Sequence, residues 1–126
     1  MSVNIPEGYQ AVTSYLIIPN AAGFIEFTKN VFNAELISKH MRDNDDVIMH
    51  GEVKIGNSVI MFADSTEQFA SQPAGFFIYV ENTDDTYQKA VDEGATPVTP
   101  VSDQPYGRTG GVKDAFGNTW WITSVI

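Results

Sequence analysis

The sequence GEVKIGNSVIMF at residues 51–62 recurs in similar form as GGVKDAFGNTWWI at residues 110–122. In both stretches, Gly-Asn is followed by a short apolar segment rich in β-forming residues. Gly-Asn beside such a segment is typical of a β-hairpin, because both residues readily adopt the backbone angles of a tight turn. The repeated hairpin predicts that the chain contains two similar units.

The segments around the first hairpin also have regular patterns. Between residues 21 and 32, large apolar residues recur at three- and four-residue steps, as in a helix that buries one face. Asn20 is expected to cap the start of this helix and Asn33 to follow its end in the left-handed conformation. The predicted elements are a strand at 10–18, a helix at 21–32, a strand at 35–41, a polar turn at 43–46, and strands at 47–55 and 58–63.

The same order of elements starts again after a polar loop at 64–74. Thr83 is expected to cap the second helix, in which Tyr87, Ala90 and Val91 share a face, and Gly94 to end it. The predicted strands are 76–80, 96–101, 110–113 and 119–126. The sequence therefore predicts an α+β fold of two βαβββ modules, at about 9–64 and 75–126, within a single domain that spans residues 1–126.

The charge balance restricts the partners. Seven Lys and Arg residues against sixteen Asp and Glu residues give a net charge of −9 on 126 residues. Such a surface repels phosphate backbones and anionic lipids, so neither nucleic acid nor membrane is expected as a partner. The chain has no cysteine, which rules out disulfides and thiolate chemistry, and no leader-like or membrane-spanning segment, so a cytoplasmic location is expected.

Eight short motifs occur in order along the chain. They are Ile5-Pro6-Glu7-Gly8-Tyr9, Tyr15-Leu16, Ile25-Glu26-Phe27, Met49-His50-Gly51-Glu52, Tyr79-Val80-Glu81-Asn82, Glu93-Gly94-Ala95-Thr96, Tyr106-Gly107-Arg108 and Asp114-Ala115-Phe116-Gly117-Asn118. In this order the chain resembles the vicinal oxygen chelate superfamily, which groups glyoxalase I, bleomycin-resistance proteins and extradiol dioxygenases, and within it the PhnB-like branch. The resemblance implies a cup-shaped mixed sheet with the helices outside, and a homodimer.

The resemblance also implies where a metal would bind. Metal-using members of the superfamily place four ligands in the cup, and the matching positions here are Thr13, Met61, Gly75 and Trp121. None of these side chains is a good ligand for a hard divalent cation. We therefore expect a cup without cofactor, in which a divalent metal could bind only through other residues.

His50 and Glu52 are candidates for such another site. They are two residues apart on a predicted strand, so both side chains point to the same face. They could form a metal-binding pair, a base with its orienting carboxylate, or a polar anchor for a ligand; alternatively, His50 is a structural residue on a solvated face. The same alternation places Ile48 beside them, and Met49, Gly51 and Val53 under the helices.

The predicted inner face is rich in aromatic residues. It contains Tyr15, Ile17, Met61, Phe77, Tyr79, Trp121 and Thr123. Arg108 lies in a glycine-flanked segment that is expected to be a loop over the mouth of the cup, where it could reach a carboxylate or phosphonate. The predicted ligand-binding residues are thus Tyr15, His50, Glu52, Met61, Phe77, Tyr79, Arg108 and Trp121, with His50 as the best catalytic candidate.

Two functions remain open at this point. The first is a homodimeric, metal-free protein that binds a small organic ligand, for which the negative net charge favours a cation. The alternative is a lyase, isomerase or dioxygenase-type enzyme that uses His50 as a base or His50 and Glu52 as metal ligands.

Overall fold

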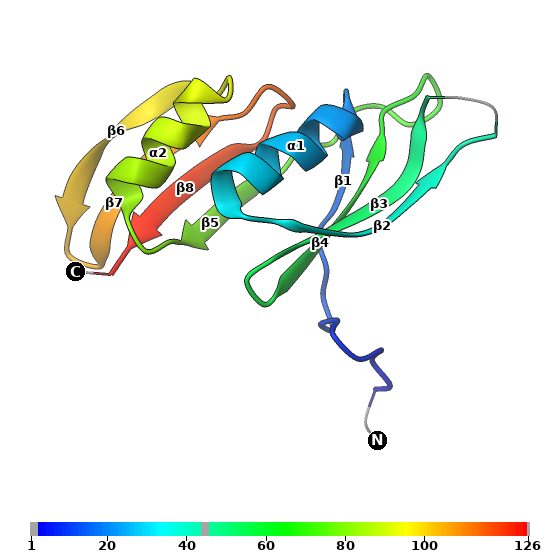
Figure 1. Cartoon of the computed structure of the whole chain (residues 1–126), viewed down its shortest axis with the longest axis horizontal. Coiled ribbons are helices and arrows are strands. Elements are labelled where there is room, and N and C mark those ends of the chain that lie inside the picture. Colours follow the sequence, from blue (N-terminus) through cyan, green and yellow to red (C-terminus); the bar gives the residue numbers. More distant parts are fainter. Residues whose placement is uncertain (1–2, 44–45, 126) are drawn as a thin grey trace.

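The computed structural model describes residues 3–43 and 46–125, which form the order βαβββ twice (Figure 1). The elements are β1 (Tyr15–Ile18), α1 (Ala21–Phe32), β2 (Glu35–Met41), β3 (Ile48–Ile55), β4 (Ser58–Asp64), β5 (Gly75–Tyr79), α2 (Thr83–Asp92), β6 (Thr96–Gln104), β7 (Gly107–Lys113) and β8 (Thr119–Ser124). The predicted α+β fold is confirmed.

Each unit forms a four-stranded mixed sheet. The strand orders are β1-β4-β3-β2 and β5-β8-β7-β6, so the two sheets have the same topology. In each sheet the first strand runs parallel to the last, and the other pairs are antiparallel. Figure 1 shows α1 and α2 side by side over the two sheets, which extend to either side. We call the sheet surface opposite the helices the inner face.

The ends of α1 follow the sequence prediction. The Asn20 side chain accepts a hydrogen bond from the Gly23 N–H at 3.1 Å, and Asn33 adopts the left-handed conformation with a φ of 58°. The second helix begins differently from the prediction. Its cap is Asn82, whose side chain accepts from the Asp85 N–H, whereas the Thr83 hydroxyl lies 2.7 Å from the Arg108 carbonyl oxygen. Thr83 is therefore the first residue of α2, and it ties the helix to β7.

A shared core joins the two units. The Phe24 ring of α1 contacts Phe62 of its own unit and Phe116 of the other, with centroids 5.2 and 5.8 Å apart. The Phe32 ring likewise lies 4.5 Å from that of Trp120 in β8. Because residues from both units fill the same space, the helix of the first unit is packed against the final hairpin of the second.

Several strand boundaries differ from the sequence prediction. β1 starts at Tyr15 rather than at residue 10, and β8 ends at Ser124, while Ile126 lies outside the described residues. The predicted polar turn at 43–46 includes residues 44–45, which also lie outside them. β6 and β7 are longer than predicted, so Arg108 belongs to a strand. Among the described residues, no helix is both long and apolar enough to cross a membrane.

Candidate functional site

Four polar side chains form a continuous chain on the inner face of the first sheet. The Tyr9 hydroxyl donates to Glu52 Oε1 at 2.5 Å, and Glu52 Oε2 lies 2.7 Å from His50 Nε2. The Tyr15 hydroxyl lies 3.3 Å from His50 Nδ1. We call these four residues the polar chain. The structure thus brings together three of the predicted site residues and adds Tyr9.

Strand register explains why these residues meet. β1 pairs in parallel with β4 so that Tyr15 is opposite Met61, and β4 pairs with β3 so that Met61 is opposite Glu52. Tyr15, Met61 and Glu52 therefore form a row across three strands, with His50 two residues from Glu52 on the same face. Glu52 is buried at 8% exposure, whereas Tyr15 is half exposed.

A β-bulge corrects one part of the sequence prediction. His40 is opposite His50 and Met41 is opposite Ile48, so Met49 is an extra residue in β3. A bulge interrupts the alternation of side chains along a strand. As a result, Ile48 belongs to the buried core rather than lining the inner face, and Met49 is exposed rather than packed under a helix.

Beyond the bulge the alternation holds. Val53 is fully buried in the core, and a Cβ atom added to Gly51 would lie 2.5 Å from the Phe62 ring. Gly51 therefore allows Phe62 to pack closely on the helix side of β3. This places His50 and Glu52 on the opposite, inner side, as predicted.

Hydrogen bonding controls the protonation of Glu52. The Tyr9 hydroxyl, which donates to Glu52, lowers the pKa of that carboxyl below its usual value, although burial acts in the opposite direction. The same bond raises the pKa of Tyr9, because a phenolate would lose the hydrogen bond and face the carboxylate. Since Glu52 is ionised at neutral pH and an ionised carboxylate only accepts, the His50 Nε2 that lies 2.7 Å from it must carry a proton; in the neutral ring, Nδ1 is then an acceptor.

The pH dependence of stability provides a test of this contact. A carboxyl with a lowered pKa stabilises the fold above its unfolded-state pKa, and this stabilisation is lost as the pH falls through the folded-state value. Tyr9→Phe removes the hydroxyl, so the pKa of Glu52 should rise toward its unfolded-state value, and the loss of stability as the pH falls below that value should become shallower than in the wild type. Urea unfolding at a series of pH values measures this slope. Equal slopes in the two proteins would show that the contact does not form in solution.

Aromatic residues cover the inner face of the second sheet. Phe77 in β5 is opposite Trp121 in β8, and Phe77 and Tyr79 are exposed at 51% and 64%. The Phe77 ring centroid lies 5.4 Å from that of Tyr79 and 6.1 Å from that of Tyr106. Tyr106 was not among the predicted site residues, although it belongs to the Tyr106-Gly107-Arg108 motif. We call Phe77, Tyr79, Tyr106 and Trp121 the aromatic face.

Arg108 lies apart from the other predicted site residues. It is part of β7 rather than of a loop, because β6 and β7 remain paired as far as Gln104 and Gly107. Its guanidinium donates to Asp84 of α2 at 2.7 and 3.1 Å and to Asp103 at 2.9 Å. These bonds lower the pKa of Asp84 and hold Arg108 on the helix side of the sheet. The prediction that Arg108 lies in a loop over the mouth of the cup is therefore wrong.

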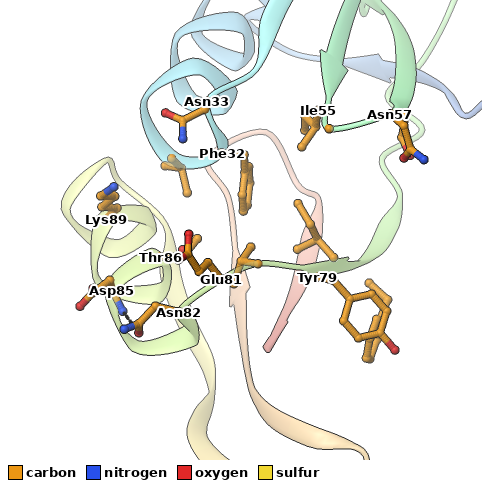
Figure 2. A pocket seen from close by; sticks show the side chains of 16 residues that line it. Phe32, Asn33, Ile55, Asn57, Tyr79, Glu81, Asn82, Asp85, Thr86 and Lys89 are labelled. Atoms are coloured by element: carbon orange, nitrogen blue, oxygen red, sulfur yellow. Dashed lines mark hydrogen bonds between the residues drawn. The ribbon is translucent and has the colours of Figure 1, made fainter. Parts of the chain in front are cut away.

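Two hollows run along β5. The larger, of about 930 Å³, lies between the end of α1, the β3–β4 turn, β5 and α2. Figure 2 shows Phe32 pointing toward β5, with polar side chains of α2 on one side and Asn57 on the other. The smaller, of about 250 Å³, lies between residues 10–14, β4 and β5. Both are lined by Phe77, so a ligand on the aromatic face would have space beside β5.

The four positions matched to metal ligands do not fit a metal. Thr13 precedes β1, Met61 lies in β4, Gly75 starts β5 and Trp121 lies in β8. They offer a hydroxyl, a thioether, no side chain and an indole, which is not a ligand set for a hard divalent cation. Within residues 3–43 and 46–125, no group of three or more His, Asp or Glu could hold a metal ion.

Comparison with known proteins identifies relatives of this chain. The family model for the Glyoxalase/Bleomycin resistance protein/Dioxygenase superfamily matches residues 10–122. An uncharacterised protein of Mycobacterium bovis is 27% identical over 132 residues, which cover 95% of this chain and 84% of that protein.

Solved structures share the fold at low sequence identity. A putative 3-demethylubiquinone-9 3-methyltransferase, PhnB protein, from Bacillus cereus has a TM-score of 0.73 and 19% identity, covering 92% of this chain and 100% of that one. The fosfomycin resistance protein FosX from Mesorhizobium loti has a TM-score of 0.68 and 10% identity, covering 90% of each chain. At these identities, the likeness concerns the fold alone.

Proposed function

The chain belongs to the Glyoxalase/Bleomycin resistance protein/Dioxygenase superfamily, and from this membership we propose that it binds a small organic ligand on its inner face without a metal. The observation that carries the proposal is the exposure of Tyr15, Phe77 and Tyr79 on that face. Grouped apolar side chains at the surface of a folded protein commonly mark a binding site. Aromatic rings with polar groups nearby are typical of sites for small organic molecules.

Net charge favours a cationic ligand. The −9 charge gives the surface a negative potential that attracts cations over distance. Tyr and Trp rings add a local attraction for a cation placed over their faces. The name of the matched family includes bleomycin resistance proteins, and the FosX protein is named for fosfomycin resistance, so resistance to a small organic molecule occurs in the names of some relatives.

The exposed apolar surface also supports a homodimer. Besides the aromatic face, Leu36 and Ile37 of β2 are exposed at 39% and 40%. A second copy that covered part of this surface would bury area that is otherwise in contact with water. Light scattering should then report about 28 kDa, twice the 13.9 kDa of one chain; a mass of one chain at micromolar concentration would argue against the dimer. The cytoplasmic location stays a prediction.

Ligand binding can be tested with a matched pair of planar probes and a matched pair of variants. The probes are 1-methylquinolinium, which is a cation, and quinoline, which is neutral near pH 7, and quenching of the fluorescence of Trp120 and Trp121 reports binding. Phe77→Ala should weaken binding of both probes roughly tenfold, because about 1.4 kcal/mol of stacking is lost. Phe69→Ala is the control, since Phe69 is also 51% exposed but lies in the loop before β5.

The salt dependence of binding separates the contribution of charge attraction from that of aromatic stacking. Added sodium chloride should weaken binding of 1-methylquinolinium and leave binding of quinoline unchanged. Only the cation is attracted by the negative charge of the protein, and salt screens that attraction. If the wild-type protein binds neither probe, or if Phe77→Ala and Phe69→Ala have equal effects, the aromatic face is not a ligand site.

A further inference from the structure

Stacking on an aromatic face does not account for the polar chain of Tyr9, Glu52, His50 and Tyr15. Three successive contacts of 2.5, 2.7 and 3.3 Å connect a residue before β1 to the hydroxyl of the half-exposed Tyr15 on the inner face. Glu52 uses both of its carboxylate oxygens inside the chain, one toward Tyr9 and one toward His50. A buried carboxylate that is bonded in this way has a fixed orientation.

The donors and acceptors of the chain have one consistent direction. A tyrosine hydroxyl can only donate to an ionised carboxylate, so Tyr9 donates to Glu52 Oε1. Glu52 Oε2 lies 2.7 Å from His50 Nε2. An ionised carboxylate only accepts, so Nε2 donates to it, and in the neutral imidazole this leaves a lone pair on Nδ1. Tyr15 then donates to Nδ1, and the Tyr15 oxygen keeps its lone pairs for a group on the inner face.

We propose that the polar chain maintains a proton acceptor at Tyr15 and His50, and that Tyr9 is a positioning residue that fixes it through Glu52. This inference rests on the proposed function, because it concerns the same inner face. The ligand class that it fits is an aromatic molecule with an O–H or N–H donor beside the ring. Such a molecule can stack on exposed rings and donate to the Tyr15 oxygen or to Nδ1 in its place.

The same arrangement can move a proton. If the ligand donor is acidic, its proton passes to the Tyr15 oxygen while the Tyr15 proton passes to His50 Nδ1. The products are an anionic ligand and an imidazolium whose Nε2–H remains bonded to the Glu52 carboxylate. The reverse transfer restores the protein, so the step balances without an oxidant, a reductant or a metal. A histidine paired with a carboxylate in this way is suited to general acid–base chemistry.

The positioning role can be measured in the free protein. The chain has only two histidines, so long-range ¹H–¹⁵N spectra of ¹⁵N-labelled protein, with His40→Ala for assignment, reveal the tautomer of each ring. We expect the Nε2–H tautomer for His50 in the wild type. Tyr9→Phe should shift the ratio of tautomers about fivefold toward Nδ1–H, since the carboxylate loses one orienting hydrogen bond of about 1 kcal/mol.

Two further variants make this result decisive. Tyr87→Phe serves as the control, because Tyr87 lies in α2 and packs against Gly110 on the helix side, and it should leave the ratio unchanged. Glu52→Gln should reverse the preference to Nδ1–H, which tests the step from Glu52 to His50 through which Tyr9 acts, if Tyr9→Phe does not fold. A wild-type His50 in the Nδ1–H form, or equal ratios in the wild type and Tyr9→Phe, would overturn the positioning role.

Ligand selectivity tests the proton acceptor. Calorimetric titration should show that 4-methylphenol binds about fivefold more tightly than 4-methylanisole, which has the same ring but no donor. Tyr15→Phe and His50→Ala should each reduce this ratio, whereas Phe77→Ala should weaken both compounds alike. Equal binding of the two compounds to the wild type would overturn the proposed role of Tyr15 and His50 as a proton acceptor. If neither compound binds, the proposed function fails for this ligand class, while the tautomer spectra still decide the role of Tyr9.

Discussion

Replacing Asp114 with alanine is expected to lower the free energy of unfolding by about 4 kcal/mol. The carboxylate is 4% exposed and accepts four hydrogen bonds. Oδ1 receives the Phe116 and Asn118 N–H groups, and Oδ2 receives Asn118 Nδ2 and Trp120 Nε1. Alanine leaves these buried donors without acceptors, and each unsatisfied buried group costs about 1–3 kcal/mol. Urea unfolding followed by circular dichroism measures the loss.

A conservative variant sharpens this prediction. Asp114→Asn keeps the size of the side chain, but either orientation of the amide turns its NH₂ group toward two donors. The loss should therefore approach that of the alanine variant. Asp43→Ala, at an exposed position, should change the free energy of unfolding by less than about 0.5 kcal/mol. A loss below about 1 kcal/mol in Asp114→Asn would show that the four bonds do not hold the β7–β8 turn.

The sequence was most informative where local chemistry determines the structure. Asn20 and Asn33 bound α1 as predicted, because capping depends on the residue itself and on its immediate neighbours. The repeated Gly-Asn turns likewise fix the register of the hairpins that contain His50, Glu52 and Trp121. Side-chain alternation from those turns then places these three residues on the inner face.

Long-range contacts account for what the sequence did not reveal. The bulge at Met49 depends on how β2 pairs with β3, which no local pattern encodes, so simple alternation along the sequence places Ile48 on the wrong face. The neighbouring glycines suggested a loop at Arg108, but pairing of β6 with β7 and two carboxylates hold it in a strand. Tyr9 reaches Glu52 across 43 positions of sequence, and only the fold brings them together.

The turn at Asp114 is more deeply buried than its sequence indicates. The sequence Asp114-Ala115-Phe116-Gly117-Asn118 indicates a turn, and a turn requires no buried residue. In the structure, Asn118 is fully buried, and its Oδ1 accepts from the Ala74 N–H at 2.9 Å. The turn therefore connects the segment before β5 to the hairpin that carries Trp121 of the aromatic face.

Trp120→Ala is expected to have the largest effect on stability, a loss of about 4–5 kcal/mol. Trp120 is 1% exposed, and its ring lies 4.3 Å from Phe76 and 4.5 Å from Phe32. Alanine would leave a cavity where α1 of one unit meets β5 and β8 of the other. Trp120→Phe should cost about half as much, because a ring remains while the hydrogen bond to Asp114 is lost.

Its neighbour Trp121 is the matched control. The Trp121 side chain lies on the inner face over Gly111 and is only partly buried, so Trp121→Ala should cost less than about 2 kcal/mol. Trp120 and Asp114 share a hydrogen bond, so the double variant Asp114→Ala/Trp120→Ala should lose at least about 1 kcal/mol less than the sum of the single losses. Strict additivity, or equal losses in Trp120→Ala and Trp121→Ala, would contradict a joint core in which the buried tryptophan links the two units.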